Sequence, residues 1–254
     1  MSSASDEVSV WTMAAPSFGS RNLDLWRSVL SVEETARAQQ LFSAADRANY
    51  VAARALLRNL LQAVGGLPAR AWEISITDSG KPAVAGPHGA PLPQISVTHT
   101  DGLVACAAGI DVAVGIDAES TRGKIPVEVA EATLAPDELR DFTAAPADRR
   151  EEIFLRLWTL REAYIKAAGL DLHFPHENFC FGLDPPRITF LDGPDSGRSS
   201  EWRLFNWSTG RHILSLAVRP TGRQSIAVNR RQIGQDELTA MLGCDSDLAI
   251  DGTL

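Results

Sequence analysis

The sequence contains no long apolar run. No stretch reaches the roughly 18 residues needed to cross a bilayer, and the longest candidate, residues 103–116, is interrupted by Asp111. Cysteine is scarce as well. Cys106, Cys180 and Cys244 are far apart and form no C-x-x-C pair, which indicates a reducing compartment and argues against a disulfide framework or a zinc site. The N-terminus lacks the basic and apolar segments of a signal peptide. We therefore expect a cytoplasmic protein with no membrane partner.

Basic residues are also fewer than acidic ones. The 254 residues include 24 Lys and Arg against 32 Asp and Glu, a formal net charge of -8. This balance argues against nucleic acid as a partner, and any site for an anion must be a local basic pocket. The glycine-rich phosphate loop, the dinucleotide-binding fingerprint and the G-x-S-x-G motif of hydrolases are all missing. With 44% hydrophobic residues, the chain can build one large domain or two small ones.

Hydrophobic periodicity predicts two long helices, at residues 46–64 and 149–168. Each contains a Leu-Arg pair with a glycine eight residues after the arginine, in segments 57–66 and 160–169. Each helix is followed by a strand, a loop and a hairpin. This internal repeat predicts an α+β fold made of a pseudo-twofold pair of similar subdomains, each a long helix packed on a small antiparallel sheet.

The repeat also sets the expected subdomain limits. We predict an N-terminal subdomain at residues 1–118, a C-terminal subdomain at 119–230, and a tail with a short helix at 231–254. Two halves in one chain make a partner subunit unnecessary, so a monomer is expected. The shorter elements are predicted as strands at 8–13, 72–77, 112–116, 179–183 and 187–191, as hairpins at 94–108 and 202–218, and as helices at 31–42 and 235–242.

Two carboxylates follow the apolar strand at 112–116. Asp117 and Glu119 are two residues apart, so both point to one side of an extended chain. Like charges this close raise each other's pKa unless a cation lies between them, and Mg²⁺ is the common solution where phosphates are bound. Glu162 adds a third carboxylate if its helix packs beside this strand. The alternative is a pair of solvated acids at the start of a loop.

The second long helix carries a column of residues on one face. Trp158, Glu162 and Lys166 are spaced four residues apart and lie one turn above another. Taken alone, this column is typical of a surface helix whose Glu–Lys pair contributes about 0.2–0.5 kcal/mol. Near Asp117, the same face instead brings a carboxylate and an ammonium to one phosphate group.

Three further groups suit a phosphate ligand. At the expected hairpin tip, His99 lies between the hydroxyls of Thr98 and Thr100, and the turn Gly80-Lys81-Pro82 presents an ammonium. The ordinary alternatives are a surface histidine for His99, a polar turn for residues 80–82 and, for a row of arginines on the first long helix, a solvated helix side. Together the residues favour phosphoryl or phosphate-ester chemistry. The arginines that can share one face of the first long helix are Arg47, Arg54 and Arg58.

Five motifs follow one another along the chain. They are Gly80-Lys81-Pro82, the segment 95–100 (ISVTHT), the segment 105–107 (ACA), the segment 114–119 (VGIDAE) and the segment 158–169 (WTLREAYIKAAG). In this order they resemble the patterns of Sfp-type 4'-phosphopantetheinyl transferases, the surfactin-synthetase-activator family, over about residues 11–218. The chain departs from the family at Thr98 and Thr100, where serine is usual, and at Arg161, where lysine is typical.

The resemblance implies a reaction and the residues that would carry it out. Coenzyme A would be the donor of phosphopantetheine, a serine of an apo carrier protein the acceptor, and 3',5'-ADP the second product. Asp117, Glu119 and Glu162 would hold Mg²⁺. Glu162, or a water that it orients, would take the serine proton, and Lys166 would neutralise charge on the transferred phosphate. The residues that would contact coenzyme A are Arg54 or Arg58 at the 3'-phosphate, with Arg37 as a weaker candidate, and Lys81, Pro82, Thr98, His99, Asp117 and Lys166.

The expected partners are apo acyl, peptidyl or aryl carrier proteins of polyketide or nonribosomal-peptide pathways. Two alternatives remain open on the residues alone. One is a non-catalytic module that binds coenzyme A or a carrier protein, although Glu162 and Lys166 are both present. The other is a Mg²⁺-dependent nucleotidyltransferase or phosphatase, which would act without a protein acceptor.

Overall fold

The computed structural model describes residues 7–17, 21–77, 80–85, 92–121, 125–170, 178–191, 196–222 and 225–247. In this part of the chain, the strand predicted at 8–13, the helix predicted at 46–64 and the hairpin predicted at 94–108 are all present. Periodicity did not indicate α1 or β3, because six and four residues are too few to repeat a pattern. The elements of the first half are β1 (Glu7–Ala14), α1 (Asn22–Arg27), α2 (Val32–Gln40), α3 (Ala44–Gly65), β2 (Glu73–Ile76), β3 (Pro82–Ala85), β4 (Gln94–Thr100) and β5 (Leu103–Gly109).

The second half repeats the order of a long helix, a strand pair and a hairpin. Both long helices end at a left-handed glycine, Gly66 with φ 76° and Gly169 with φ 67°, a conformation that glycine adopts without strain. Among the described helices, none combines the length and apolar composition that crossing a bilayer demands. The remaining elements are β6 (Val112–Ser120), α4 (Val127–Thr133), α5 (Pro136–Ala144), α6 (Arg150–Ala168), β7 (Phe179–Leu183), β8 (Pro186–Phe190), β9 (Arg203–Thr209), β10 (His212–Pro220), β11 (Ala227–Gln232) and α7 (Gln235–Asp247).

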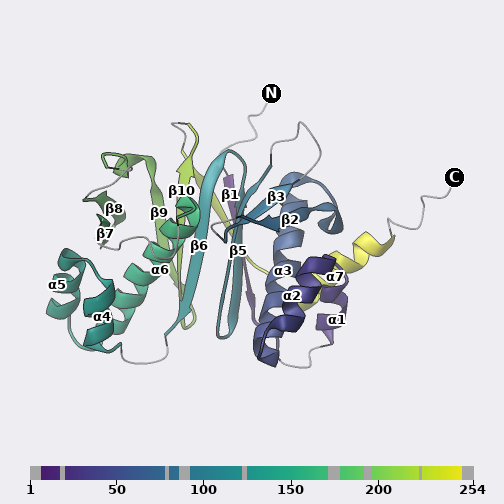
Figure 1. The fold of residues 1–254 in the computed structure, drawn as a ribbon, viewed down its shortest axis with the longest axis horizontal. Helices are drawn as coiled ribbons and strands as arrows, with labels where there is room; N and C mark the ends of the chain where they lie inside the picture. Colours follow the sequence, from purple (N-terminus) through teal and green to yellow (C-terminus); the bar gives the residue numbers. More distant parts are fainter. Residues whose placement is uncertain are drawn as a thin grey trace.

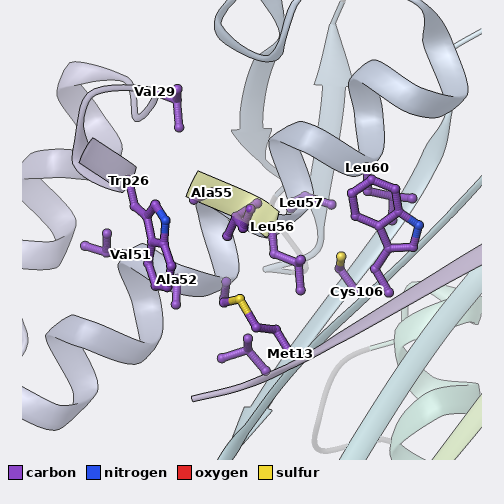
Figure 2. Close-up of a cluster of buried hydrophobic side chains, with 14 of the residues drawn as sticks. Met13, Trp26, Val29, Val51, Ala52, Ala55, Leu56, Leu57, Leu60 and Cys106 are labelled. Atoms are coloured by element: carbon purple, nitrogen blue, oxygen red, sulfur yellow. The ribbon is translucent and has the colours of Figure 1, made fainter. Parts of the chain in front are cut away.

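Two sheets lie in the middle of the molecule with helices on their outer sides (Figure 1). One sheet has the strand order β11-β1-β5-β4 and the other β6-β10-β9. Neighbouring residues of a strand face opposite ways, so Val104 of β5 packs in the core under α3, whereas Ala105 packs in the core between the sheets. Figure 2 shows the first of these cores, with Leu56 of α3 beside Met13 of β1. The α+β class expected from the sequence is confirmed.

The last two elements return to the first half. β11 pairs in parallel with β1, and α7 contacts α1 and α3. The boundary predicted at residue 118 falls inside β6, and β11 begins within the range 119–230 although its pairing partner belongs to the first half. The subdomain limits themselves stay a prediction. The helix predicted at 235–242 is present and continues to Asp247.

Each half contains a buried arginine–glutamate pair in the corresponding place. In the first half, Arg58 of α3 binds Glu34 of α2, with Nη2 and Oε2 2.8 Å apart. In the second half, Arg161 of α6 binds Glu138 of α5, with Nη2 and Oε2 2.5 Å apart. Both glutamates also accept the backbone N–H of the residue that precedes their own helix. The sequence repeat is therefore a structural repeat, in which the start of a short helix is tied to the long helix.

α6 lies directly on β6 at a glycine. Gly115 faces α6, and a Cβ there would overlap the carbonyl oxygen of Ala163 and lie 2.5 Å from the backbone nitrogen of Ala167. Both alanines are buried, so small residues line the contact from both sides. This close approach brings the turns of α6 next to Ala163 over Asp117, the following residue of β6 on the same face.

The buried pair in the second half should be far more costly to break than an exposed one. Arg161→Met leaves the Glu138 carboxylate in the interior without its cation, so the free energy of unfolding should fall by about 3–5 kcal/mol. Arg140→Met removes an ion pair with Asp137 whose side chains are 69% and 68% exposed, and should cost less than about 1 kcal/mol. Urea denaturation of both variants checks this. Equal costs would mean that the Arg161 pair is solvated.

The close contact at Gly115 predicts that two glycine-to-alanine substitutions differ in their effect on the free energy of unfolding. Gly115→Ala should lower the free energy of unfolding by about 1–3 kcal/mol, because the added methyl forces α6 off β6. Gly234→Ala is the matched control, since the nearest atom to a Cβ there is the Glu237 Cβ at 3.9 Å. Thermal unfolding should therefore show a lowered midpoint for Gly115→Ala alone. A shared midpoint would contradict the close contact.

Candidate active site

The carboxylate of Asp117 is enclosed between β4, β6 and α6. The residue is 5% exposed. Its Oδ1 accepts hydrogen bonds from Lys166 Nζ at 2.6 Å and from Thr98 Oγ1 at 3.1 Å. Its Oδ2 is buried and has no hydrogen-bond partner among the described residues. Because an unpaired buried acceptor is costly, this oxygen is set up to receive a cation or a donor from a ligand.

Three hydroxyls of β4 face β6 at every second residue. Ser96 Oγ accepts the backbone N–H of Ile116 at 3.0 Å, Thr98 donates to Asp117, and Thr100 Oγ1 donates to Glu119 Oε2 at 3.3 Å. The row fixes the carboxylates relative to β4. Ser96 was not among the residues singled out from the sequence, although the alternation of hydroxyls at 96, 98 and 100 was a signal for it.

Glu119 and Glu162 complete the group of carboxylates. Burial raises the pKa of both side chains, and the charge of Asp117 raises both pKa values further. Lys166 lowers both, and hydrogen bonds from Thr100 and Trp158 lower the pKa of Glu119. Asp117 is therefore close enough to affect the ionisation of both glutamates, and a cation would relieve the repulsion among the three carboxylates.

The donor set fits a magnesium ion that is held only in part by protein. In the described part of the chain, no group of three or more His, Cys, Asp or Glu side chains is placed to hold a metal ion by itself, and Asp117 instead binds Lys166 through one oxygen. All candidate donors are carboxylate oxygens, and the unpartnered Oδ2 of Asp117 offers a ligand position. Mg²⁺ prefers one or two carboxylates, with waters and substrate phosphates at its other positions. The residues are suited to that mode of binding.

His99 and Lys81 lie to either side of these carboxylates. Since Thr98 faces Asp117, the next residue, His99, faces the opposite side of β4. Burial lowers the pKa of His99, as does the charge of Lys166, while Asp46 at the start of α3 raises it. Lys81 Nζ donates to the carbonyl oxygen of Ala167 near the end of α6 at 3.1 Å, and burial lowers the pKa of Lys81. Pro82 follows it as the first residue of β3.

A basic cavity of about 1050 Å³ opens between α2, α3 and β2. Tyr50 and Arg54 of α3 line it, with the Arg54 guanidinium carbon 5.2 Å from the centre of the Tyr50 ring. Arg54 Nη1 is buried and has no hydrogen-bond partner among the residues described. Arg37 and Arg70 also line the cavity. A buried guanidinium with an unused donor, beside further arginines, suits a phosphate.

Arg58 borders the same cavity, but its donors are committed to internal contacts. It is 1% exposed. Its Nη1 donates to the carbonyl oxygens of Ala69 and Trp72, and its Nε and Nη2 bind Glu34. Of the two arginines predicted as alternatives for the 3'-phosphate, only Arg54 keeps a donor for a ligand. The sequence alone did not separate them, because they lie one turn apart on the same helix.

Comparisons with known proteins agree with this arrangement. Residues 113–218 match the model of the 4'-phosphopantetheinyl transferase superfamily. The chain is 30% identical to the 4'-phosphopantetheinyl transferase HetI of Nostoc sp. over 65% of this chain and 70% of HetI. It is 26% identical to psf-1 of Bacillus pumilus over 82% and 87% of the two chains, and 23% identical to Sfp of Bacillus subtilis over 79% and 88%. The Sfp-type resemblance is confirmed, and the chain belongs to the 4'-phosphopantetheinyl transferase superfamily.

Proposed function

We propose that this protein transfers 4'-phosphopantetheine from coenzyme A to a serine of an apo carrier protein, in a Mg²⁺-dependent reaction that releases 3',5'-ADP. The observation that carries the proposal is the meeting of Asp117, Glu119, Glu162 and Lys166 where α6 packs on β6. The relatives are 4'-phosphopantetheinyl transferases, which supports the transferase activity. A non-catalytic binding module has no need for Glu119 and Glu162 beside Asp117, where burial and the charge of Asp117 raise the pKa of both glutamates.

We propose that bound coenzyme A extends from the basic cavity to the carboxylates. Its 3'-phosphate would meet Arg54, whose Nη1 is the donor left without a partner among the described residues. Gly80 lines the cavity, and Lys81 beside it reaches α6, so the Gly80-Lys81-Pro82 turn connects the cavity with the site. Lys166 would then meet the pyrophosphate, together with Thr98 and His99.

The transfer step is a substitution at phosphorus. The serine oxygen of the carrier attacks the β-phosphorus, the bond from this phosphorus to the bridging oxygen breaks, and the bridging oxygen leaves on 3',5'-ADP. Glu162, directly or through a water, accepts the serine proton. Lys166 stabilises the negative charge that develops on the phosphoryl oxygens.

Asp117, Glu119 and Glu162 are the residues that would hold Mg²⁺. The bound ion supplies charge neutralisation and orientation of the phosphate oxygens. Without it, the carboxylates would repel a pyrophosphate, since Lys166 is the one ammonium that contacts them among the residues described. We further infer that the carriers are acyl, peptidyl or aryl carrier proteins of polyketide or nonribosomal-peptide systems, and that the chain acts as a monomer in the cytoplasm.

A transfer assay tests the proposed reaction. The protein, coenzyme A, MgCl₂ and an apo carrier protein are mixed, and intact-mass spectrometry should show the carrier gaining one phosphopantetheine. Asp117→Asn keeps the size of the side chain but removes its charge, so kcat should fall by about 10²-fold or more. Asp24→Asn, at a carboxylate that is 89% exposed, serves as the control and should retain the activity.

Three results would contradict this reaction. The first is no mass gain with acyl, peptidyl or aryl carriers. The second is full transfer in the presence of EDTA, which would remove the metal from the proposal. The third is turnover of nucleotides without a carrier protein, which would favour a nucleotidyltransferase or phosphatase.

Arg54 should determine how well the enzyme distinguishes coenzyme A from dephospho-coenzyme A, which lacks the 3'-phosphate. Arg54→Met should raise the KM for coenzyme A by about ten- to a hundredfold, as expected for a lost hydrogen bond to a charged group. The KM for dephospho-coenzyme A should change little. Steady-state kinetics with both donors checks this. If the variant still prefers coenzyme A as strongly as the wild type, Arg54 does not bind the 3'-phosphate.

A further inference from the structure

A row of polar side chains crosses the buried contact between α6 and the second sheet. Thr159 of α6 and Ser215 of β10 are both 0% exposed, and their hydroxyl oxygens are 2.8 Å apart. Asn206 Nδ2 of β9 donates to Ser215 Oγ at 2.8 Å, and Arg156 Nε donates to Asn206 Oδ1 at 2.8 Å. Arg156 and Thr159 are three residues apart on α6. The row therefore leaves α6, passes through β9 and β10, and returns to α6.

The hydrogen bonds of this row have one consistent direction. Arg156 can only donate, and Asn206 gives its amide protons to Ser215. Thr159 donates its proton to the carbonyl oxygen of Leu155 at 2.8 Å, so Ser215 must donate to Thr159. Each hydroxyl then gives and accepts a hydrogen bond. A buried network satisfied in a single direction specifies one position of the helix.

The described residues of the first half form no such row. Aligning the two buried arginines of the repeat sets Leu56 and Ala53 of α3 against Thr159 and Arg156 of α6. Leu56 and Ala53 are buried in an apolar core. Apolar packing is therefore sufficient to hold the long helix of this repeat on its sheet. The polar row occurs only in the half that supplies the carboxylates and the ammonium of the site, which indicates a role beyond folding.

The row lies next to the site. Ser215 is the cross-strand partner of Asp117, and Glu162 follows Thr159 by three residues on the same side of α6. The glycine contact between α6 and β6 sets how closely the helix approaches, but small side chains do not stop it from sliding. We propose that Thr159, Ser215 and Asn206 are positioning residues that fix the height and the rotation of α6. They thereby hold Glu162 over Asp117, and this role rests on the proposed transferase function.

Single hydroxyl deletions test the role. Thr159→Val and Ser215→Ala should each lower kcat by about tenfold or more, since a shift of about 1 Å at a catalytic group costs up to about 10²-fold. At saturating Mg²⁺, the KM for coenzyme A should change less than kcat, because the 3'-phosphate is proposed to meet Arg54 of α3, in the other half. Thr159→Ser keeps the hydroxyl and should keep kcat. The dissociation constant of Mn²⁺, measured by electron paramagnetic resonance without coenzyme A or carrier, should rise in Thr159→Val and not in Thr159→Ser.

Thr239 of α7 provides a matched control. It also donates to the carbonyl oxygen four residues back and accepts a bond from another element, here Trp26 Nε1 at 3.1 Å. Thr239→Val should lower the thermal midpoint but leave kcat within about twofold, because it acts on stability alone. If Thr159→Val does not fold, Ser215→Ala and Asn206→Ala decide the outcome by the same measurements.

The outcomes separate this role from the proposed function. The positioning role is wrong if the folded variants keep kcat and Mn²⁺ affinity, or if Thr239→Val lowers kcat as much as they do. A wild-type protein that binds Mn²⁺ but modifies no carrier refutes the proposed function, and Mn²⁺ affinity in the variants then decides the positioning role. A wild-type protein that neither binds Mn²⁺ nor modifies a carrier overturns both.

Discussion

The absence of a side chain at Gly115 is the constraint on which the site depends. It lets the backbone of α6 rest on β6, and the distance between helix and strand sets the distance between Glu162 and Asp117. Larger residues at this contact would separate the carboxylates, which affect one another's pKa only because they are close. The same approach lets Lys166 reach Asp117 at 2.6 Å. A packing requirement in the interior is thus also a requirement of the chemistry.

The two halves share one backbone arrangement but carry different polar side chains on their long helices. Each ties a short helix to a long helix through a buried arginine and glutamate. In α3, Arg54 lies one turn before Arg58 and faces the basic cavity. In α6, the residue that follows Arg161 is Glu162. Similar backbones therefore carry different side chains, a cation in the first half and an acid in the second. Under the proposed function, the cation would bind a phosphate and the acid would bind a metal and accept a proton.

The sequence predicted what depends on local patterns and on spacing. Periodicity identified both long helices and the main hairpins, and the two-residue spacing of Asp117 and Glu119 put them on one strand face. The return of β11 to β1 was not predictable, because pairing between segments more than 200 residues apart leaves no local signal. The roles of Arg54 and Arg58 were not separable either. Glu34 of α2 contacts both arginines, at 2.8 Å from Arg58 and 3.7 Å from Arg54. The difference arises because Arg58 also donates to two buried carbonyl oxygens.

The charges at the site link the binding of the donor to the binding of a metal. In the part of the chain that the structure describes, Lys166 is the ammonium that binds Asp117 beside Glu119 and Glu162, and the whole chain carries a net charge of -8. Screening limits the effect of distant surface charges to about 8–10 Å. The local excess of acids therefore determines the charge that a ligand meets at the site. If these acids are ionised, a pyrophosphate that enters next to them raises the repulsion unless a divalent cation enters with it. Under the proposed function, metal and coenzyme A should therefore bind cooperatively, with the arginine-lined cavity holding the far end of the donor independently of the metal.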